Sequence, residues 1–195
     1  MAEKPDKSQE KLLRYFYIVA KSLVHIIEAR DHYTKGHSEK VAAYAVKIAR
    51  KMGFSEDGIE LLEETAFLHD IGKLGIDEDI LDKKEKLTDE EWEAIRRHPI
   101  IGEDMLRPIT LRPELLTLVR THHERYDGKG YPDKLTGDNI SVFAAILSVA
   151  DAYDAMTTEK PYRHAMTKEE AIEELKRCSG SQFNPKIVDI FLSII

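Results

Sequence analysis

Apolar side chains recur along most of the chain at steps of three and four residues, which is the spacing of amphipathic helices. The clearest early stripe consists of Leu12, Phe16, Val19, Leu23 and Ile26. A stripe of fewer than about three heptads is most often the core-facing side of a helix, so we expect it to be buried. A dimerising or signal-coupling helix is the alternative, for which ~3–4 heptads would be better evidence. An N-terminal helix is therefore predicted in residues 1–25.

The rest of the chain shows the same spacing. A second apolar stripe consists of His37, Val41, Tyr44, Ile48 and Met52. Gly53 follows it and favours the end of a helix there. Further helix starts are indicated by N-cap residues, capping boxes or first-turn prolines: Ser55, Thr88 with Glu91, Pro113, Thr167 with Glu170, and Pro185. No convincing period-two pattern with hairpin turns is present. We predict an all-α fold with about eight or nine helices.

Two segments interrupt the helical pattern and are predicted to be loops. Residues 73–87 are strongly charged and contain Gly75, and residues 126–139 hold several glycines and Pro132. The second segment is too rich in helix breakers for a helix interior. No internal repeat and no Gly/Ser linker divides the chain. We therefore expect a single helical domain over residues 26–195, preceded by the N-terminal helix.

Composition narrows the class of protein. The 195 residues are 42% hydrophobic and 33% charged, as in an ordinary globular protein, and no apolar run approaches the ~20 residues of a membrane helix. With 36 acidic residues against 29 basic ones the net charge is −7, which disfavours binding to duplex nucleic acid. Cys178 is the single cysteine, which excludes an intrachain disulfide and suits a reducing cytosol. We expect a cytoplasmic protein without membrane insertion.

The most unusual feature of the composition is the placement of its eight histidines. His69 and Asp70 follow an apolar run, and for one such dipeptide a hydrogen-bonded buried pair is the simplest explanation. Asp151 lies in a helix that is apolar nearly all round, where an isolated carboxylate would need a cation. Other histidines lie at predicted helix ends or on apolar faces: His37, His98, His122 and His123. Imidazole and carboxylate groups without a thiol suit iron, manganese, cobalt or zinc.

These residues lie within motifs that resemble a known family. The sequence HDIGK at 69–73 resembles the signature of the HD metal-dependent phosphohydrolases. HHERYDGKGYP at 122–132 resembles the longer motif that names the HD-GYP subgroup, the bacterial cyclic di-GMP phosphodiesterases. Supporting segments follow in the family's order: DHYTKGHS at 31–38, HPIIG at 98–102, ADAYDAMT at 150–157 and KPYR at 160–163. The resemblance covers residues 26–195, which we assign to an HD-GYP domain.

The resemblance implies a site with two divalent metal ions, iron or manganese before other transition metals. Asp70 would bridge the two ions, and the coordination positions left over would take water and substrate phosphate oxygens, as two-metal phosphodiester hydrolysis requires. The residues that match the family's metal ligands are His37, His69, Asp70, His98, His122, His123 and Asp151.

A third ion is not expected. In part of the family a glutamate four residues before the first histidine resembles a ligand for a third ion, but Tyr33 stands there, and a neutral phenol is a poor ligand. Asp31 lies on a different part of the turn. Glu28 is about two helical turns from His37, which is too far unless the chain folds back.

Other matching residues are expected at the substrate. Lys73 resembles a phosphate-binding lysine and is predicted to be catalytic together with Asp70, although a solvated loop lysine is the alternative. Asp154 would hold a metal-ligating histidine or a guanine base, or face solvent. The residues assigned to substrate binding are Lys73, Gly130, Tyr131, Pro132, Asp154, Lys160 and Arg163. Departures from the family pattern at Ser141, Ala145, Lys160 and Asn184 bear on substrate affinity more than on metal binding.

The expected function is hydrolysis of cyclic di-GMP to linear pGpG, with GMP as a further product. A relative that acts on another nucleotide is one alternative. A catalytically degenerate sensor or interaction module for cyclic dinucleotides is another, although the complete ligand set argues against it. The resemblance also leaves open a sensor or receiver-domain partner and a homodimer.

Overall fold

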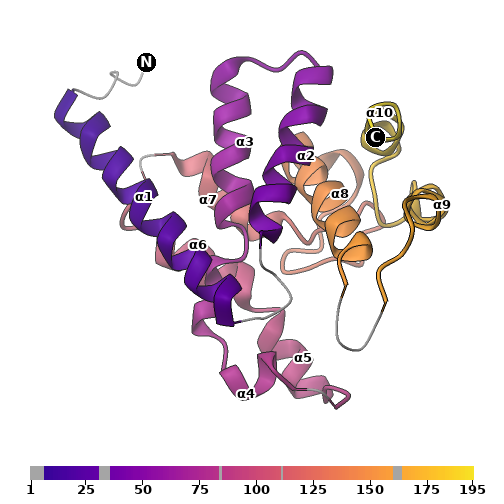
Figure 1. The fold of residues 1–195 in the computed structure, drawn as a ribbon, viewed down its shortest axis with the longest axis horizontal. Coiled ribbons are helices and arrows are strands. Elements are labelled where there is room, and N and C mark those ends of the chain that lie inside the picture. The colour runs from indigo at the N-terminus through magenta and orange to yellow at the C-terminus, as the bar shows by residue number, and fades with distance from the viewer. Residues whose placement is uncertain (1–6, 31–35, 84, 111, 160–163) are drawn as a thin grey trace.

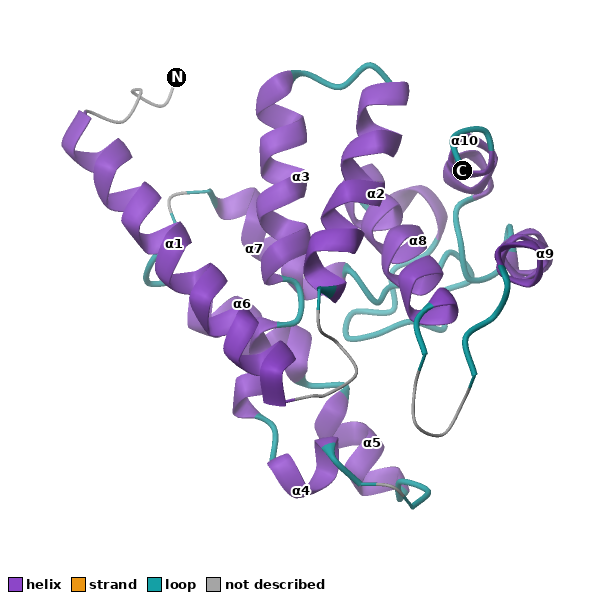
Figure 2. Cartoon of the chain, viewed as in Figure 1, coloured by secondary structure: helices purple, strands orange, loops and turns teal. Residues whose placement is uncertain are grey.

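The computed structural model describes residues 7–30, 36–83, 85–110, 112–159 and 164–195, apart from the side chains of residues 7–10, 12–14, 16, 27, 29 and 30. This part of the chain contains ten α-helices, two short 3₁₀ helices and no strand (Figures 1 and 2). The elements are α1 (Lys7–Arg30), α2 (His37–Lys51), α3 (Glu56–Leu68), η1 (Ile71–Gly75), α4 (Glu78–Leu81), α5 (Asp89–Ile95), α6 (His98–Leu106), α7 (Pro113–Thr121), η2 (Gly137–Asn139), α8 (Val142–Thr157), α9 (Lys168–Cys178) and α10 (Pro185–Leu192). The prediction of an all-α fold is confirmed.

The predicted helix starts are confirmed as well. Ser55 caps α3 by accepting a hydrogen bond from the backbone N–H of Gly58 at 3.3 Å. Capping boxes begin α5 and α9, and prolines stand in the first turns of α7 and α10. These signals act within a few residues of the chain, so the local sequence is enough to place them.

The loop predicted over residues 73–87 is partly wrong, because it contains α4 and most of η1. Asp77 caps α4 by accepting a hydrogen bond from the backbone N–H of Asp79 at 3.0 Å. A helix of one turn with no buried residue shows no apolar stripe, so the hydrophobic pattern could not reveal it. The loop predicted over residues 126–139 is confirmed except for η2 at its end.

The core lies where α2 packs against α3 and α8 (Figure 1). Ile48 of α2, Leu62 of α3 and Ile146 of α8 are fully buried there. α7 packs against α3 and α8 from another side, and α10 covers α2 and α8. Because α2 and α3 are antiparallel neighbours, the first residue of α2 lies close to the end of α3, which is where the candidate site forms.

α1 packs on the outside of this core, against α3 and η1 (Figure 1). The stripe predicted to face the core is wrong as far as it can be followed: Val19, Leu23 and Ile26 are 56%, 38% and 51% exposed. The side chains of the other two members, Leu12 and Phe16, lie outside the described residues. Ala20 and Val24 are buried instead. The helix carries apolar residues on more than one face, so spacing alone could not show which face the body covers.

The expected division between residues 25 and 26 falls inside α1, which continues to Arg30, and it stays a prediction. Among the described residues, no helix has both the length and the apolar character that a bilayer-spanning segment needs.

Candidate metal centre

All seven predicted metal ligands come together at one place, from five helices and their ends. His37 is the first residue of α2, His98 is the first residue of α6, and Asp151 lies within α8. His69 and Asp70 follow α3 directly, and His122 and His123 follow α7.

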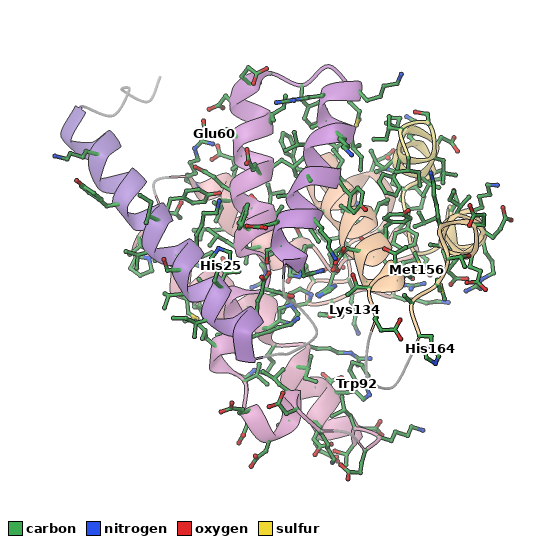
Figure 3. The ribbon with its side chains drawn as sticks, viewed as in Figure 1. His25, Glu60, Trp92, Lys134, Met156 and His164 are labelled. Atoms are coloured by element: carbon green, nitrogen blue, oxygen red, sulfur yellow. The ribbon has the colours of Figure 1, made fainter. Side chains whose placement is uncertain are left out.

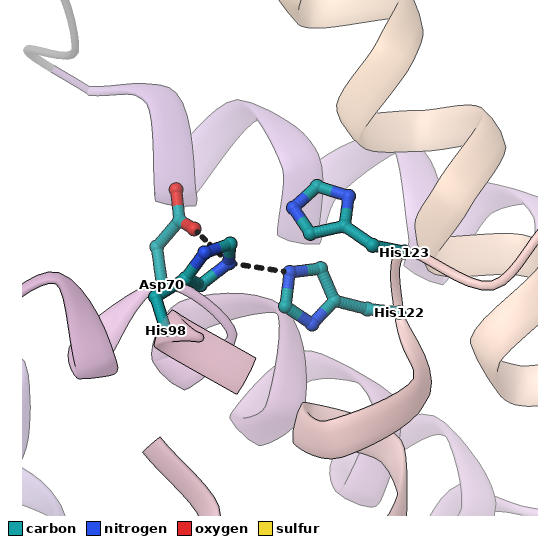
Figure 4. A group of neighbouring side chains, drawn as sticks. All are labelled: Asp70, His98, His122 and His123. Carbon is teal, nitrogen blue, oxygen red and sulfur yellow. Dashed lines mark hydrogen bonds and ion pairs between the residues drawn. The ribbon is translucent and has the colours of Figure 1, made fainter. Parts of the chain in front are cut away.

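The ligands fall into two groups that share Asp70. One group consists of His37, His69 and Asp70, and the other of Asp70, His98, His122 and His123; within each group the possible donor atoms lie within 4.8 Å of one another. Figure 4 shows the second group. Oδ1 of Asp151 lies 3.3 Å from Nε2 of His37, so this carboxylate belongs beside the first group. A carboxylate common to both groups is the arrangement of two neighbouring cation positions with one bridging ligand.

The orientation of three histidine rings is set by backbone carbonyls at helix ends. Nδ1 of His69, His98 and His122 donates to the carbonyl oxygen three residues earlier, at 2.7, 2.8 and 2.6 Å respectively. Those carbonyls belong to the last turns of α3, α5 and α7, where no intrahelical N–H is available to them. Because a carbonyl oxygen only accepts, each Nδ1 carries the proton and each Nε2 directs a lone pair into the site.

These lone pairs lack partners of their own. Nε2 of His69 is buried without a hydrogen-bond partner among the described residues. Nε2 of His98 faces Nε2 of His122 at 3.3 Å and Oδ1 of Asp70 at 3.2 Å, so three acceptors point at one another (Figure 4). Buried acceptors in this arrangement are unfavourable unless a cation lies between them. The donor set therefore fits a metal ion.

The pKa values of the candidate ligands favour the ionic forms that metal binding requires. Burial lowers the pKa of His69, takes that of His122 well below its usual range, and lowers that of His123 to about 3, so these rings are neutral. Burial would raise the pKa of Asp70, but the Lys73 ammonium beside it holds that pKa well below its usual range. Neutral imidazole and ionised carboxylate are the forms that bind metal ions.

His37 is the exception among the histidines. Burial would lower its pKa, but hydrogen bonds to Asp151 and Asp154 raise that pKa to about 10. Nδ1 of His37 donates to Oδ2 of Asp154 at 2.7 Å, while Nε2 faces Asp151. Asp154 is 1% exposed and lies behind the ring, within 3.5 Å of the Lys40 ammonium. Asp154 therefore holds the ring of His37 from behind and does not face solvent.

Comparisons with known proteins agree with this geometry. The family model of the HD domain matches residues 21–187. The chain belongs to the HD domain family. The 3′3′-cGAMP-specific phosphodiesterase 3 of Vibrio cholerae is 37% identical over 172 residues, which are 88% of this chain and 37% of that protein. A cyclic di-GMP phosphodiesterase of Thermotoga maritima is 38% identical over 184 residues, which are 92% of this chain and 50% of that protein.

The fold of this HD domain is also found in solved structures. Bd1817, an HDG"Y"P protein of Bdellovibrio bacteriovorus, superimposes with a TM-score of 0.70 at 20% identity, over 93% of this chain and 63% of that one. The family match and the curated relatives confirm the resemblance that the sequence motifs carry, and this structure agrees in fold. The chain spans half or less of the length of the curated relatives named above.

Lys73 lies beside Asp70, the residue that the two groups of candidate ligands share. Its Nζ donates to Oδ2 of Asp70 at 2.6 Å, and its side chain is 24% exposed. The ammonium therefore contacts the shared carboxylate, and the Lys73 side chain is partly open to solvent.

The loop that follows the two histidines packs against them. The Tyr131 ring lies 4.9 Å from the His123 ring at 33°, and the backbone N–H of Tyr131 donates to the carbonyl of His123 at 3.4 Å. Gly130 is buried against the backbone of residues 123–125, and a Cβ there would lie 2.7 Å from the His123 carbonyl oxygen. Tyr131 and Pro132 are partly exposed beside the site, whereas Gly130 permits the close approach of the loop.

The other predicted basic residues, Lys160 and Arg163, lie outside the described residues, as do Asp31 and Tyr33.

Three supporting residues were not recognised from the sequence. Glu124 is buried, and its two carboxylate oxygens accept from the backbone N–H groups of Asp133 and Leu135 at 2.7 and 3.0 Å, which holds the loop. A Cβ on Gly72 would overlap the carbonyl of His98, so glycine is needed where η1 meets α6. Glu124 and Gly72 both lie inside the recognised motifs, so the motifs themselves could have indicated their roles.

Glu28 is the third, and the sequence placed it too far from His37 unless the chain folds back. The chain does fold back: the Glu28 carboxylate accepts from the backbone N–H groups of Gly36 and Ser38 at 3.0 and 2.8 Å. Glu28 thus ties α1 to the start of α2, through the two residues that flank the candidate ligand His37.

Proposed function

We propose that this HD domain is a metal-dependent phosphodiesterase that hydrolyses cyclic di-GMP to linear pGpG. The observation that supports it best is the pair of ligand groups sharing Asp70, because two adjoining cations suit cleavage of a phosphodiester. The two curated relatives named above are phosphodiesterases that act, by their names, on cyclic dinucleotides.

The ligands divide naturally between two ions. His37, His69, Asp70 and Asp151 would hold one ion, and Asp70, His98, His122 and His123 the other. Imidazole and carboxylate donors without a thiol favour iron or manganese, and other divalent transition metals suit the same chemistry. When bound, such ions lower the pKa of coordinated water and absorb negative charge on the phosphate.

The catalytic residues of this proposal are Asp70 and Lys73. Asp70 presents Oδ1 toward His98 of one ligand group and Oδ2 toward His69 of the other, so it would bridge the two ions. Lys73 also contacts Oδ2. The Lys73 ammonium would donate a hydrogen bond to a non-bridging phosphate oxygen and stabilise the charge that develops there in the transition state.

The remaining predicted residues divide between substrate contact and positioning. Tyr131 and Pro132 are partly exposed beside His123, which suits contact with a nucleotide. Gly130 and Asp154 are buried, so we assign them positioning roles for the loop and for His37. Lys160 and Arg163 stay predictions as phosphate-binding residues.

A second candidate substrate is 3′3′-cGAMP, because one relative at 37% identity is named for that specificity. The two substrates differ at one base, and the metal centre and Lys73 address the phosphates that both share. The ligand set therefore supports the reaction more strongly than it supports the choice between them.

Partners of the whole protein remain predictions. Tyr15, Val19 and Ile26 of α1 are each more than half exposed, and they are where a homodimer or a sensor or receiver-domain partner would make contact.

The test is turnover by protein of known metal content. Protein loaded separately with manganese and iron is incubated with cyclic di-GMP or 3′3′-cGAMP, and products are separated by chromatography. We expect pGpG from cyclic di-GMP, and none from Asp70→Ala protein. Turnover of 3′3′-cGAMP alone would select the second candidate. Binding without any turnover in metal-loaded protein would instead identify a sensor and contradict the proposal.

A further inference from the structure

The tryptophan on α5 lies in an exposed position that packing does not explain. Trp92 is the single tryptophan of the chain and is 47% exposed, and α5 has no buried residue (Figure 3). Beside it is a cavity of about 290 Å³ lined by Asp89, Trp92, Glu93 and Arg96. That volume is close to the lower end of the range for small-molecule sites, ~300–1,000 Å³.

This cavity is connected to the metal centre by a cation–π contact and a ring–ring contact. Trp92 and Arg96 are four residues apart and so share one side of the helical turn. The Arg96 guanidinium lies 5.9 Å from the centre of the Tyr131 ring, and that ring lies 4.9 Å from the ring of the metal-ligand candidate His123. A ligand that occupied the cavity would therefore extend toward the metal centre past Arg96 and Tyr131.

The lining residues have the chemistry of a purine site. An exposed indole face stacks on a nucleobase. Carboxylates such as Asp89 and Glu93 accept hydrogen bonds, and guanine offers adjacent N–H donors on its Watson–Crick edge, whereas adenine presents an acceptor at the central position of that edge. Arg96 donates to Oε1 of Glu93 at 2.6 Å, which orients the carboxylate and leaves further guanidinium N–H groups for a base or phosphate oxygen.

We infer that the cavity formed by Asp89, Trp92, Glu93 and Arg96 binds a guanine base of a cyclic dinucleotide whose phosphates lie at the metal centre. The inference rests on the proposed function and adds a base-recognition site to it. Trp92 stacks on the guanine, Glu93 accepts from its N–H groups, and Arg96 bridges the base site and the loop of Tyr131.

The single tryptophan permits a direct binding measurement. Metal-loaded protein is titrated with a non-hydrolysable phosphorothioate analogue of cyclic di-GMP, and tryptophan fluorescence is followed, with free N-acetyltryptophanamide correcting for absorption by the ligand. We expect saturable quenching, because all the signal comes from Trp92. Replacement of Glu93 by glutamine should weaken binding of this analogue several-fold more than binding of the corresponding cyclic di-AMP analogue.

Kinetics separate this site from the metal centre. Trp92→Ala should raise KM for cyclic di-GMP roughly tenfold or more and leave kcat within about twofold, and Trp92→Phe should restore most of the affinity. Ile109→Ala, which removes another exposed large apolar side chain, is the matched control and should change neither. Circular dichroism melting curves check that each variant is folded.

The outcomes distinguish the two proposals. Normal hydrolysis with unchanged KM in Trp92→Ala and no quenching would overturn the base site and leave the phosphodiesterase standing. Saturable quenching without hydrolysis would overturn the phosphodiesterase and support the base site as a binding site alone.

Discussion

Nδ1 of His37 donates to Oδ2 of Asp154 at 2.7 Å, and this buried pair joins the first residue of α2 to α8. The hydrogen bond fixes the ring so that Nε2 faces Asp151 and the first ligand group. A carboxylate behind a metal-ligating histidine sets the tautomer and orientation of the ring and raises its basicity.

Asp154→Asn should therefore weaken metal binding at the His37 group by ~10–100-fold while the other group keeps its affinity. Metal content after dialysis against a graded chelator series would be measured by elemental analysis. Asp189→Asn, on the exposed side of α10, is the matched control and should bind metal as the unmodified protein does. Equal metal affinity in Asp154→Asn and in the control would show that Asp154 does not support metal binding by His37.

The shared position of Asp70 predicts an asymmetry among ligand variants. Asp70→Ala should lose both ions and all hydrolysis, because each ligand group loses a member. His37→Ala and His123→Ala should each lose ions from one group only, since each belongs to one group. Elemental analysis of the three purified variants, together with turnover of cyclic di-GMP, makes the comparison. Full metal occupancy in Asp70→Ala would be incompatible with a bridging carboxylate.

Much of the fold could be predicted from sequence because its signals are local. The caps at Ser55, Thr88 and Thr167 act within three residues of each helix start, and the structure confirms all three. The buried face of α1 could not be predicted in the same way. Val24 and Ile26 are both apolar, and only the packing of α1 against α3 and η1 decides that Val24 is buried and Ile26 exposed.

The candidate site also has features that the sequence could predict and features that depend on how distant segments pack. The family resemblance implied the seven candidate ligands, and imidazole and carboxylate groups suit a divalent metal ion. The sharing of Asp70 between two groups was expected from the family resemblance, and the structure brings the side chains together accordingly. The role of Glu28 could not be predicted, since it depends on how α1 returns to the start of α2, which no local signal encodes.

Lys73 is expected to act on the substrate rather than on the metal ions. Lys73→Met keeps most of the aliphatic stem and removes the ammonium that lies 2.6 Å from Asp70. The variant should retain its metal content and lower kcat by roughly a hundredfold, the usual effect of losing one preorganised charge donor. Lys168→Met, at the exposed start of α9, serves as the control. Steady-state turnover at fixed metal occupancy is the measurement, and an unchanged kcat would exclude Lys73 from catalysis.

The last prediction concerns the number of ions and the role of Glu28. Both carboxylate oxygens of Glu28 already accept backbone N–H groups at the start of α2, so Glu28 is occupied as a cap and is a poor candidate for a third ligand. We expect two ions per chain, and anomalous diffraction from crystals grown with excess manganese would count them.

Glu28→Ala should keep both metal positions but lower the free energy of unfolding by ~1–3 kcal/mol, because buried N–H groups lose their acceptor. Thermal melting measures that loss, with exposed Glu39→Ala in the first turn of α2 as the control. A third fully occupied ion against Glu28 at the start of α2 would show that this carboxylate is a metal ligand and that the two-ion site is wrong.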